Sequence, residues 1–316
     1  MSERPDVAAT GPRQLPRLAL GCGNFGGIGS APEFFGQGLD EAQAGALMDA
    51  AWEMGITHFD TADAYGGGRS ELTIGRWIAQ RGVRPTLTSK TFHPLVPGGD
   101  SGLDPERIAR SIEASLGRLG VSRIELYLAH EPDPAVPIDV ALQGFEREQR
   151  AGTIAAYGVS NVTAADLQQA LGAGRPVAVQ NGFSLLQRDD DPEVLDLCAA
   201  NDVAYTAFGP LFGGWLAGRY RRGEAYPEGS RMRQRPEPYL ATATDRTFDA
   251  LESLQRFAEE RGISMAGASL AWLLADSRIS QVVVGPGRPA QLEPVAEALA
   301  NPMAGSDRDL LCEAFA

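Results

Sequence analysis

Four side chains that can move a proton follow three successive short apolar runs of the chain. Asp60 and Tyr65 follow the first run, Lys90 ends the second and His130 ends the third. A nearby ammonium stabilises a tyrosine phenolate and lowers its pKa, and a carboxylate beside that ammonium keeps it charged. Histidine can donate a hydrogen bond to a substrate carbonyl. The set predicts general acid catalysis, in which Tyr65 protonates a carbonyl oxygen as hydride reaches the carbon.

The composition singles out Lys90 independently. The chain holds 28 lysines and arginines, and Lys90 is the only lysine among them. Arginine stays protonated, whereas the pKa of a buried ammonium responds to its surroundings. A lone lysine in an arginine-rich chain is therefore predicted to be functional. Because no side chain supplies hydride, this chemistry also requires a cofactor.

The elements that must position these residues alternate regularly between strand and helix. Several strand candidates are almost continuously apolar, as strands buried on both faces should be. Strands are expected at Leu18–Leu20, Thr57–Thr61, Thr86–Ser89, Ile124–Ala129, Ala155–Ser160, Val177–Gln180, Val203–Phe208 and Gln281–Val284. Eight βα units in one chain predict an α/β fold of the (β/α)8 TIM-barrel type, whose active sites lie at the carboxyl ends of the strands.

Helices are expected between these strands, with capping residues at several starts. Asp40 with Gln43 and Thr163 with Asp166 have capping-box spacing. Asp104 and Asp191 each precede a proline suited to the first helical turn. Periodicity predicts helices at Glu41–Met54, Ser70–Arg81, Pro137–Ala151, Asp245–Arg261, Met265–Ala275 and Pro289–Ala300.

The chain is expected to form one barrel domain over residues 1–316, with residues 1–16 as a flexible tail. A doubly wound alternative would need a linker near the middle, and the sequence has none. One long irregular stretch, Gly209 to Thr244, follows the seventh strand. A loop of that length is usually functional, and we expect it on the cofactor side of the barrel.

The segment Gly21–Gly26 matches the G-x-G-x-x-G pattern directly after the first strand. A dinucleotide-binding fold requires a helix to open on those glycines. The residues that follow, Gly27 to Pro32, are rich in glycine and cannot form one. The segment is therefore interpreted as a glycine-rich loop.

The charge balance excludes several classes of partner. The net charge of −13 argues against sequence-independent nucleic-acid binding, which needs clustered cations, and against a polybasic membrane surface. The sequence has no apolar run long enough for a transmembrane helix and no apolar signal-peptide core. Three distant cysteines form no disulfide framework or metal-ligand pair. A cytoplasmic protein without a metal site is expected.

The second predicted strand carries a recognisable signature. Gly55–Gly66, read GITHFDTADAYG, followed by Ser70, Glu71 and Gly75, resembles the corresponding motif of the aldo-keto reductase superfamily. The similarity extends from about Leu18 to Leu299. It implies a (β/α)8 barrel that binds a nicotinamide cofactor across the strand ends. It also implies that the family's Asp-Tyr-Lys-His tetrad corresponds to Asp60, Tyr65, Lys90 and His130, in agreement with the assignment from the residues alone.

The resemblance implies further cofactor contacts. Ser160, Asn161 and Gln180 match the residues that bind the nicotinamide carboxamide, and Phe208 matches the aromatic that stacks on its ring. Gly209-Pro210-Leu211 resembles the turn that wraps the pyrophosphate, although Gly209 lacks the usual hydroxyl. Six arginines lie between Arg219 and Arg235, and at least one is expected to bind phosphate. The other expected cofactor residues are Gly23, Asn24, Asp60, Gly213, Arg219, Arg231 (with Ser230), Gly285, Gly287, Arg288 and Gln291.

The last strand departs most from the family pattern. Gln291 is retained, but the Glu-Asn pair that usually contacts adenine is absent. The serine and lysine that often bind the 2′-phosphate are absent too, and Arg288 can replace them as a bidentate partner. NADPH is therefore the expected cofactor and NAD stays open. The long loop is expected to fold over the cofactor as a clamp.

Three functions stay open at this point. The first is reduction of an aldehyde or ketone, including a sugar or a secondary-metabolite carbonyl. The second is an NAD-dependent aldose dehydrogenase, and the third is a cofactor-sensing subunit similar to potassium-channel β-subunits. The partner is expected to be a small-molecule carbonyl compound, and a homo-oligomer is compatible with the sequence. Phe25, Phe92 and Trp215 are the candidates for pocket walls, with ordinary loop anchoring as their alternative role.

Overall fold

A computed structural model describes residues 15–316. Residues 1–14 of the expected flexible tail lie outside the described residues. The last two residues of that expected tail are packed, which corrects the prediction for them. Leu15 is 5% exposed and contacts the apolar interior of the barrel, and the carbonyl oxygen of Pro16 accepts a hydrogen bond from Gln281 Nε2 at 2.8 Å.

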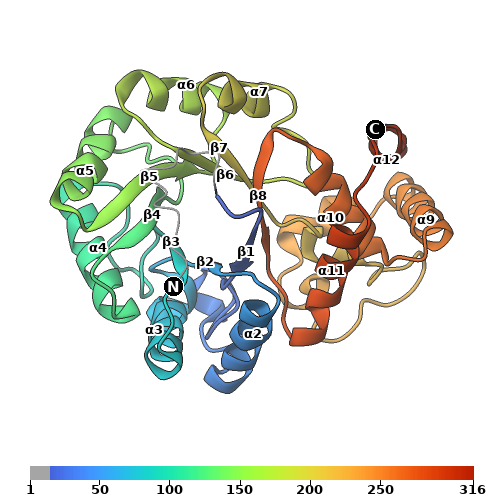
Figure 1. Cartoon of the computed structure of the whole chain (residues 1–316), viewed down its shortest axis with the longest axis horizontal. Helices are drawn as coiled ribbons and strands as arrows, with labels where there is room; N and C mark the ends of the chain where they lie inside the picture. Colours follow the sequence, from blue (N-terminus) through green and yellow to red (C-terminus); the bar gives the residue numbers. More distant parts are fainter. Residues whose placement is uncertain (1–14) are drawn as a thin grey trace.

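Eight parallel strands close into a barrel in chain order, and the last pairs with the first. The helices surround this barrel (Figure 1). All eight predicted strands are present, with ends shifted at most of them. They are β1 (Leu18–Gly21), β2 (His58–Asp60), β3 (Thr86–Thr91), β4 (Ile124–Ala129), β5 (Ile154–Ser160), β6 (Ala178–Gly182), β7 (Ala204–Phe208) and β8 (Ile279–Val284).

The described helices agree with the predictions in most places. The α-helices are α2 (Glu41–Glu53), α3 (Arg69–Arg81), α4 (Pro105–Leu119), α5 (Ile138–Ala151), α6 (Ala164–Ala173), α7 (Glu193–Ala200), α8 (Arg231–Gln234), α9 (Asp245–Glu260), α10 (Met265–Ala275), α11 (Glu293–Ala300) and α12 (Gly305–Ala314). The 3-10 helices are η2 (Pro32–Phe34), η3 (Tyr65–Gly68), η4 (Phe212–Ala217), η5 (Glu237–Thr242) and η6 (Pro289–Leu292).

Local capping explains where several helices begin. Both predicted capping boxes form, at Asp40 and at Thr163, and Asp104 accepts from two amides of α4. The prediction at Asp191 was wrong, because α7 begins after Pro192 and Asp191 forms an ion pair with Arg278.

Two predicted stretches of helix or loop are built differently from expectation. The predicted helix Pro289–Ala300 is divided between η6 and α11. The long stretch from Gly209 to Thr244 is not wholly irregular, because it contains η4, α8 and η5. Its chain therefore has local structure able to present side chains at defined positions.

The interior of the barrel changes from apolar to polar toward the carboxyl ends of the strands. The lower part packs Leu15 against Leu126, Leu128, Ala156, Ala178 and Ala204. Above it, His58 lies 2.8 Å from Thr88 Oγ1 and 2.8 Å from Gln281 Nε2, and burial lowers the pKa of His58 to about 4. Alternate residues of a strand share a face, so Asp60 and Lys90 lie one layer further up.

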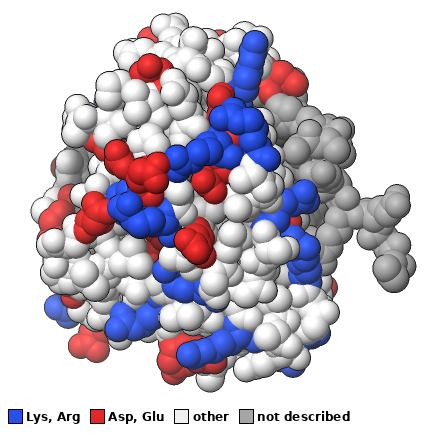
Figure 2. Space-filling view, turned by 90° about the vertical axis from the view of Figure 1, so that its left-hand side faces the viewer, with Lys and Arg blue, Asp and Glu red and all other residues white. Residues whose placement is uncertain are grey.

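On the face of the molecule that Figure 2 shows, charges of both signs are interspersed rather than gathered by sign. On the side of the molecule that bears α4 and α5, basic and acidic side chains lie next to each other (Figure 2). Arg147 pairs there with Glu106, and Arg150 with Glu146. Within residues 15–316, every helix is too short or too polar to cross a membrane.

Candidate active site

The structure brings the four predicted proton-moving residues together at one end of the barrel. Asp60 ends β2, Lys90 lies near the end of β3 and His130 directly follows β4. Tyr65 begins η3, the turn that links β2 to α3. Asp60, Lys90 and His130 are buried, and Tyr65 keeps part of its side chain accessible. The adjacent pairing of the parallel strands β2, β3 and β4 places these side chains side by side.

Lys90 is the centre of this cluster. Its Nζ donates to Asp60 Oδ1 at 2.5 Å and to the carbonyl oxygen of Thr61 at 2.8 Å, and lies 5.1 Å from the centre of the Tyr65 ring. The second Asp60 oxygen accepts from Gln180 Nε2 at 2.7 Å. Burial opposes the charge on Lys90, but Asp60 and Tyr65 outweigh it and raise the lysine pKa above its ordinary value. The ammonium is therefore charged and fixed in place.

The pKa of Tyr65 corrects one part of the sequence analysis. The sequence predicted a lowered value, because Lys90 stabilises the phenolate. In the structure burial raises the pKa of Tyr65, and the opposing effect of Lys90 does not overcome it. The hydroxyl of Tyr65 is therefore protonated at neutral pH.

His130 packs against Tyr65 and is electrically neutral. The two rings meet edge to face with their centres 5.5 Å apart. Burial, followed by the charge of Lys90, lowers the pKa of His130 well below its usual value. Within the described part of the chain, Nδ1 of His130 is buried without a hydrogen-bond partner. A neutral imidazole here can orient a carbonyl oxygen between its own ring and Tyr65.

The expected carboxamide-binding residues lie beside the tetrad. Ser160 Oγ donates to the carbonyl oxygen of Gln180 at 2.6 Å, and Asn161 Nδ2 donates to the carbonyl oxygen of His130 at 2.8 Å. Gln180 uses its amide to hold Asp60. These contacts tie β5 and β6 to the tetrad.

The glycine-rich loop after β1 forms the opposite wall. A Cβ built on Gly23 would lie 3.5 Å from the ring of Tyr65, at ordinary van der Waals distance, so this loop lies directly beside the tyrosine. Asn24 Nδ2 donates to the carbonyl oxygen of Pro286 at 3.0 Å, which joins the loop to the end of β8.

Two of the three predicted pocket walls are corrected by the structure. Phe25 and Trp215 are each 0% exposed, so neither offers surface to a substrate, and both are core anchors of their loops. Phe92 remains partly accessible, with its ring centre 5.3 Å from that of His93.

The stretch after β7 presents backbone turns and several arginines that have no carboxylate partner within the described part of the chain. Gly209, Gly213 and Gly214 adopt positive φ angles of 65°, 64° and 99°. The chain therefore bends on both sides of the expected pyrophosphate residues Pro210 and Leu211. Among residues 15–316, no carboxylate forms an ion pair with Arg219, Arg231 or Arg235, whereas Arg222 binds Asp245 and Asp249. The hydroxyl of Ser230 is buried without a partner in that same range.

The loop after β8 holds the remaining predicted cofactor residues. Gly285, Gly287 and Arg288 are exposed, and Gln291 Oε1 accepts from the backbone N–H of Gly287 at 2.7 Å. Arg288 precedes η6 and carries its charge at the surface. The sequence placed these residues correctly at a strand end.

His93 was missed from the sequence, and Arg235 was expected only as one of six arginines of which at least one binds phosphate. His93 meets His130 edge to face with ring centres 4.8 Å apart, and its Nε2 lies 3.2 Å from Glu131 Oε1. Arg235 lies in the stretch after α8 with its guanidinium over the ring of Phe34 at 5.8 Å. The chain has three histidines, and His93 could have been suspected because it lies just after the third strand. Nothing in the sequence indicates where Arg235 points.

A buried network supports the turn that carries Tyr65. Glu71 accepts from Ser89 Oγ at 2.6 Å and from Arg118 Nε at 2.7 Å, and Asp63 accepts from Thr91 Oγ1 at 2.6 Å. Burial raises the pKa of Asp63 to about 7, and its carboxylate borders a cavity of about 240 Å³. The Glu71 position belongs to the signature motif, so its structural use explains part of that motif.

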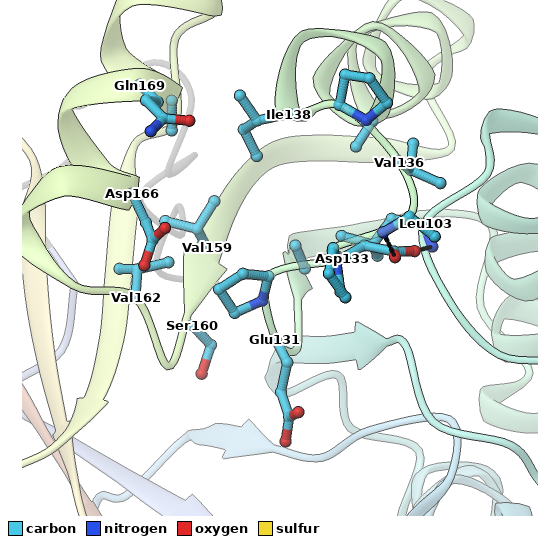
Figure 3. Close-up of a pocket in the computed structure, with 17 residues that line it drawn as sticks. Leu103, Glu131, Asp133, Val136, Ile138, Val159, Ser160, Val162, Asp166 and Gln169 are labelled. Atoms are coloured by element: carbon cyan, nitrogen blue, oxygen red, sulfur yellow. Dashed lines mark hydrogen bonds between the residues drawn. The ribbon is translucent and has the colours of Figure 1, made fainter.

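A separate cavity of about 290 Å³ lies between α5, α6 and the outer faces of β4 and β5. Ile138 and Gln169 enter it from the helices, whereas the carboxylate of Glu131 and the hydroxyl of Ser160 point away from them (Figure 3). The strand residues that line it, such as Val159, belong to the core outside the barrel rather than to the barrel interior. The cavity therefore lies outside the barrel wall at β4 and β5, whereas the tetrad lies at the carboxyl ends of β2, β3 and β4.

Comparison with known proteins agrees with this geometry. The Aldo/keto reductase family model matches residues 17–311. An uncharacterized oxidoreductase, YrpG of Bacillus subtilis, is 32% identical over 90% of this chain and 88% of its own. An L-glyceraldehyde 3-phosphate reductase of Escherichia coli is 30% identical over 91% and 85%. A glycerol dehydrogenase from Gluconobacter oxydans superimposes with a TM-score of 0.81 at 24% identity, over 95% of this chain and 91% of that one.

Proposed function

The chain belongs to the aldo/keto reductase family, and from this we propose that it reduces the carbonyl group of a small aldehyde or ketone with NADPH. The observation that carries the proposal is Lys90, held between Asp60 and Tyr65 at the mouth of the barrel. The Escherichia coli relative is named for the reduction of an aldehyde, which supports this direction. If the protein is cytoplasmic, as proposed, NADPH is available to it in that compartment.

Tyr65 is proposed as the general acid. A tyrosine is protonated at neutral pH already at its ordinary pKa, and burial raises the pKa of Tyr65 further, so its hydroxyl carries a proton to be given to the carbonyl oxygen. Lys90 then stabilises the phenolate that forms, and Asp60 keeps Lys90 charged. Neutral His130 donates a hydrogen bond to the same oxygen and orients it. These groups are already in place before substrate arrives, which is how an enzyme stabilises developing charge at little reorganisation cost.

The residues around the tetrad fit a nicotinamide dinucleotide. When bound, this cofactor supplies the hydride that no side chain provides. Ser160, Asn161 and Gln180 would hold the carboxamide. Arg219 and Arg231 have no carboxylate partner within the described range, and the buried hydroxyl of Ser230 has no hydrogen-bond partner there. All three side chains are therefore suited to bind phosphate oxygens.

The experiment that tests the proposal is a titration with NADPH and with NADH, followed by tryptophan fluorescence. A preference for NADPH of at least about tenfold corresponds to about 1.4 kcal/mol from the 2′-phosphate. That result supports Arg288 or a loop arginine as its partner. Equal or tighter binding of NADH would favour an NAD-dependent dehydrogenase, and binding of neither would refute the cofactor assignment.

A further inference from the structure

One arginine of the stretch after β7 reaches the loop that follows β1. Arg235 follows α8, and its side chain crosses to the loop after β1, where the guanidinium lies 5.8 Å from the centre of the Phe34 ring. Its Nη1 lies 3.7 Å from the position of a Cβ on Gly29. Gly29 is hydrogen-bonded through its carbonyl oxygen to the backbone of Gly66, the residue after Tyr65. Arg235 therefore borders the tyrosine side of the opening.

A row of aromatic rings that meet edge to face leads away from Tyr65. Tyr65 contacts His130, His130 contacts His93, and His93 contacts Phe92, with ring centres 4.8 to 5.5 Å apart. Arg235 is close enough to this row for its charge to act on His93. A substrate whose carbonyl meets Tyr65 and His130 therefore has a cationic group within reach on the His93 side of the site.

Glu131 and Arg107, two other charged groups near this point, contact partners within the chain, whereas Arg231, close enough to Arg235 to feel its charge, has no carboxylate partner among residues 15–316. Glu131 interacts with His93, and Arg107 is 4% exposed and binds carbonyl oxygens of its own loop and the Asp100 carboxylate. Arg235 is partly exposed, and among the described residues it has no ion-pair partner. A guanidinium fork in this position matches a carboxylate or a phosphate.

We propose that Arg235 determines substrate specificity by binding an anionic group of the substrate, so that the preferred carbonyl compound carries a carboxylate or a phosphate a few bonds from its reacting carbon. The inference rests on the proposed reductase function and names its substrate class. The face of the Phe34 ring attracts the guanidinium of Arg235 and helps to hold it at this position. Burial lowers the pKa of His93, so its neutral ring can form a hydrogen bond with the part of the substrate between the carbonyl and the anionic group.

The test compares charged aldehydes with neutral partners of similar size. Succinic semialdehyde is paired with methyl 4-oxobutanoate, and glyceraldehyde 3-phosphate with glyceraldehyde. The two pairs distinguish a carboxylate from a phosphate. We expect kcat/KM to favour at least one charged member by about tenfold or more, since charge-assisted fork contacts are among the stronger hydrogen bonds. The preference should shrink as salt is added.

Variants of Arg235 locate that preference. Arg235→Met should lower kcat/KM for the charged aldehyde about tenfold to hundredfold and leave the neutral one within about threefold. Arg235→Lys should recover part of the loss, because it restores the charge without the fork. Arg233→Met is the matched control, since this exposed arginine lies two residues away on α8. It should behave as the parent protein, and thermal unfolding should show that all variants fold.

The outcomes separate this inference from the function beneath it. No turnover of any aldehyde with NADPH or NADH would refute the reductase function itself. Turnover of neutral aldehydes with no preference for either charged member would overturn the inference alone. An equal loss on both members of a pair in Arg235→Met, together with weaker NADPH binding, would also overturn it, because Arg235 would then be a cofactor residue.

Discussion

The tetrad at the ends of β2, β3 and β4 and the stretch from Gly209 to Thr244 face the same opening but are built in opposite ways. In the tetrad each charged group is paired within the chain, since Lys90 binds Asp60 and Asp60 also binds Gln180. In the stretch after β7, Arg219, Arg231 and Arg235 have no carboxylate partner in the described residues. The comparison teaches that the first region is completed by folding, whereas the second is suited to completion by its ligands.

Replacing Tyr65 by phenylalanine removes the proposed proton donor from the tetrad. The Tyr65→Phe variant should lose carbonyl reduction by about a thousandfold, because the proton donor is gone. Its affinity for NADPH should change by less than about twofold, because the phenol acts only in the transition state. Steady-state kinetics and a fluorescence titration measure the two effects. Tyr226→Phe, in the loop, is the control, and substantial turnover in Tyr65→Phe would refute Tyr65 as the acid.

Neutralising Asp60 tests whether the first region is part of the folded core. Asp60→Asn leaves the buried ammonium of Lys90 without its carboxylate, so the free energy of unfolding should fall by about 4 kcal/mol. Glu41→Gln provides the comparison, because it removes a half-exposed partner of Arg76 and should cost less than about 1 kcal/mol. Denaturant unfolding measures both. Equal losses would show that the burial of the Asp60–Lys90 pair does not matter.

The pH dependence of stability sharpens the contrast through Asp63. Its folded pKa is raised to about 7 from 3.8, so the native state binds this proton more tightly than the unfolded chain. The contribution of Asp63 to stability is therefore present at low pH and is lost as pH rises to about 7. The free energy of unfolding of Asp63→Asn, relative to that of the parent protein, should therefore rise by a few kcal/mol as pH increases across that window. Above about pH 7 the difference between the two should stay constant.

The parent protein and the Asp63→Asn variant keep the same titratable and charged groups around position 63. Glu71 raises the pKa of Asp63, whereas Thr91, Arg107 and Arg118 lower it. His58 acts in the reverse direction, because its lowered pKa of about 4 makes stability fall as pH drops toward that value. The difference between variant and parent cancels the effect of His58. A difference that does not change between pH 4 and 7 would contradict the raised pKa of Asp63.

Arg231 gives the smallest expected effect and belongs to the second region. Arg231→Met should weaken NADPH binding about tenfold, or about 1.4 kcal/mol, because a phosphate loses its partner. The free energy of unfolding should change by less than about 0.5 kcal/mol. Isothermal calorimetry and thermal unfolding measure the two quantities. A large loss of stability with unchanged cofactor affinity would place Arg231 with the structural charges instead.

Most of the barrel could be predicted because its signals are local. Strand runs buried on both faces, and capping side chains such as Asp40 and Thr163, each leave a pattern within a few residues. The placement of the tetrad could be predicted for a related reason. In a parallel barrel the carboxyl ends of neighbouring strands meet, so residues far apart in the chain are brought to one place.

The rest depends on tertiary contacts that no local pattern records. The aromatic rings of Phe25 and Trp215 were expected at the pocket but turn into the core. The net pKa of Tyr65 depends on how completely the ring is surrounded, and burial outweighs Lys90 there. The position of Arg235 depends on how the stretch after β7 crosses to Phe34. In each case the deciding neighbour comes from a different element.

The lone lysine has a practical consequence. An activated ester or reductive methylation has, apart from the α-amino group, one amine to attack in this chain, and that amine is 1% exposed and bound to Asp60. Labelling with 13C-methyl groups would thus yield a single lysine resonance in an NMR spectrum. Its chemical shift would follow the tetrad alone, and its rate of labelling would report how often the mouth of the barrel opens.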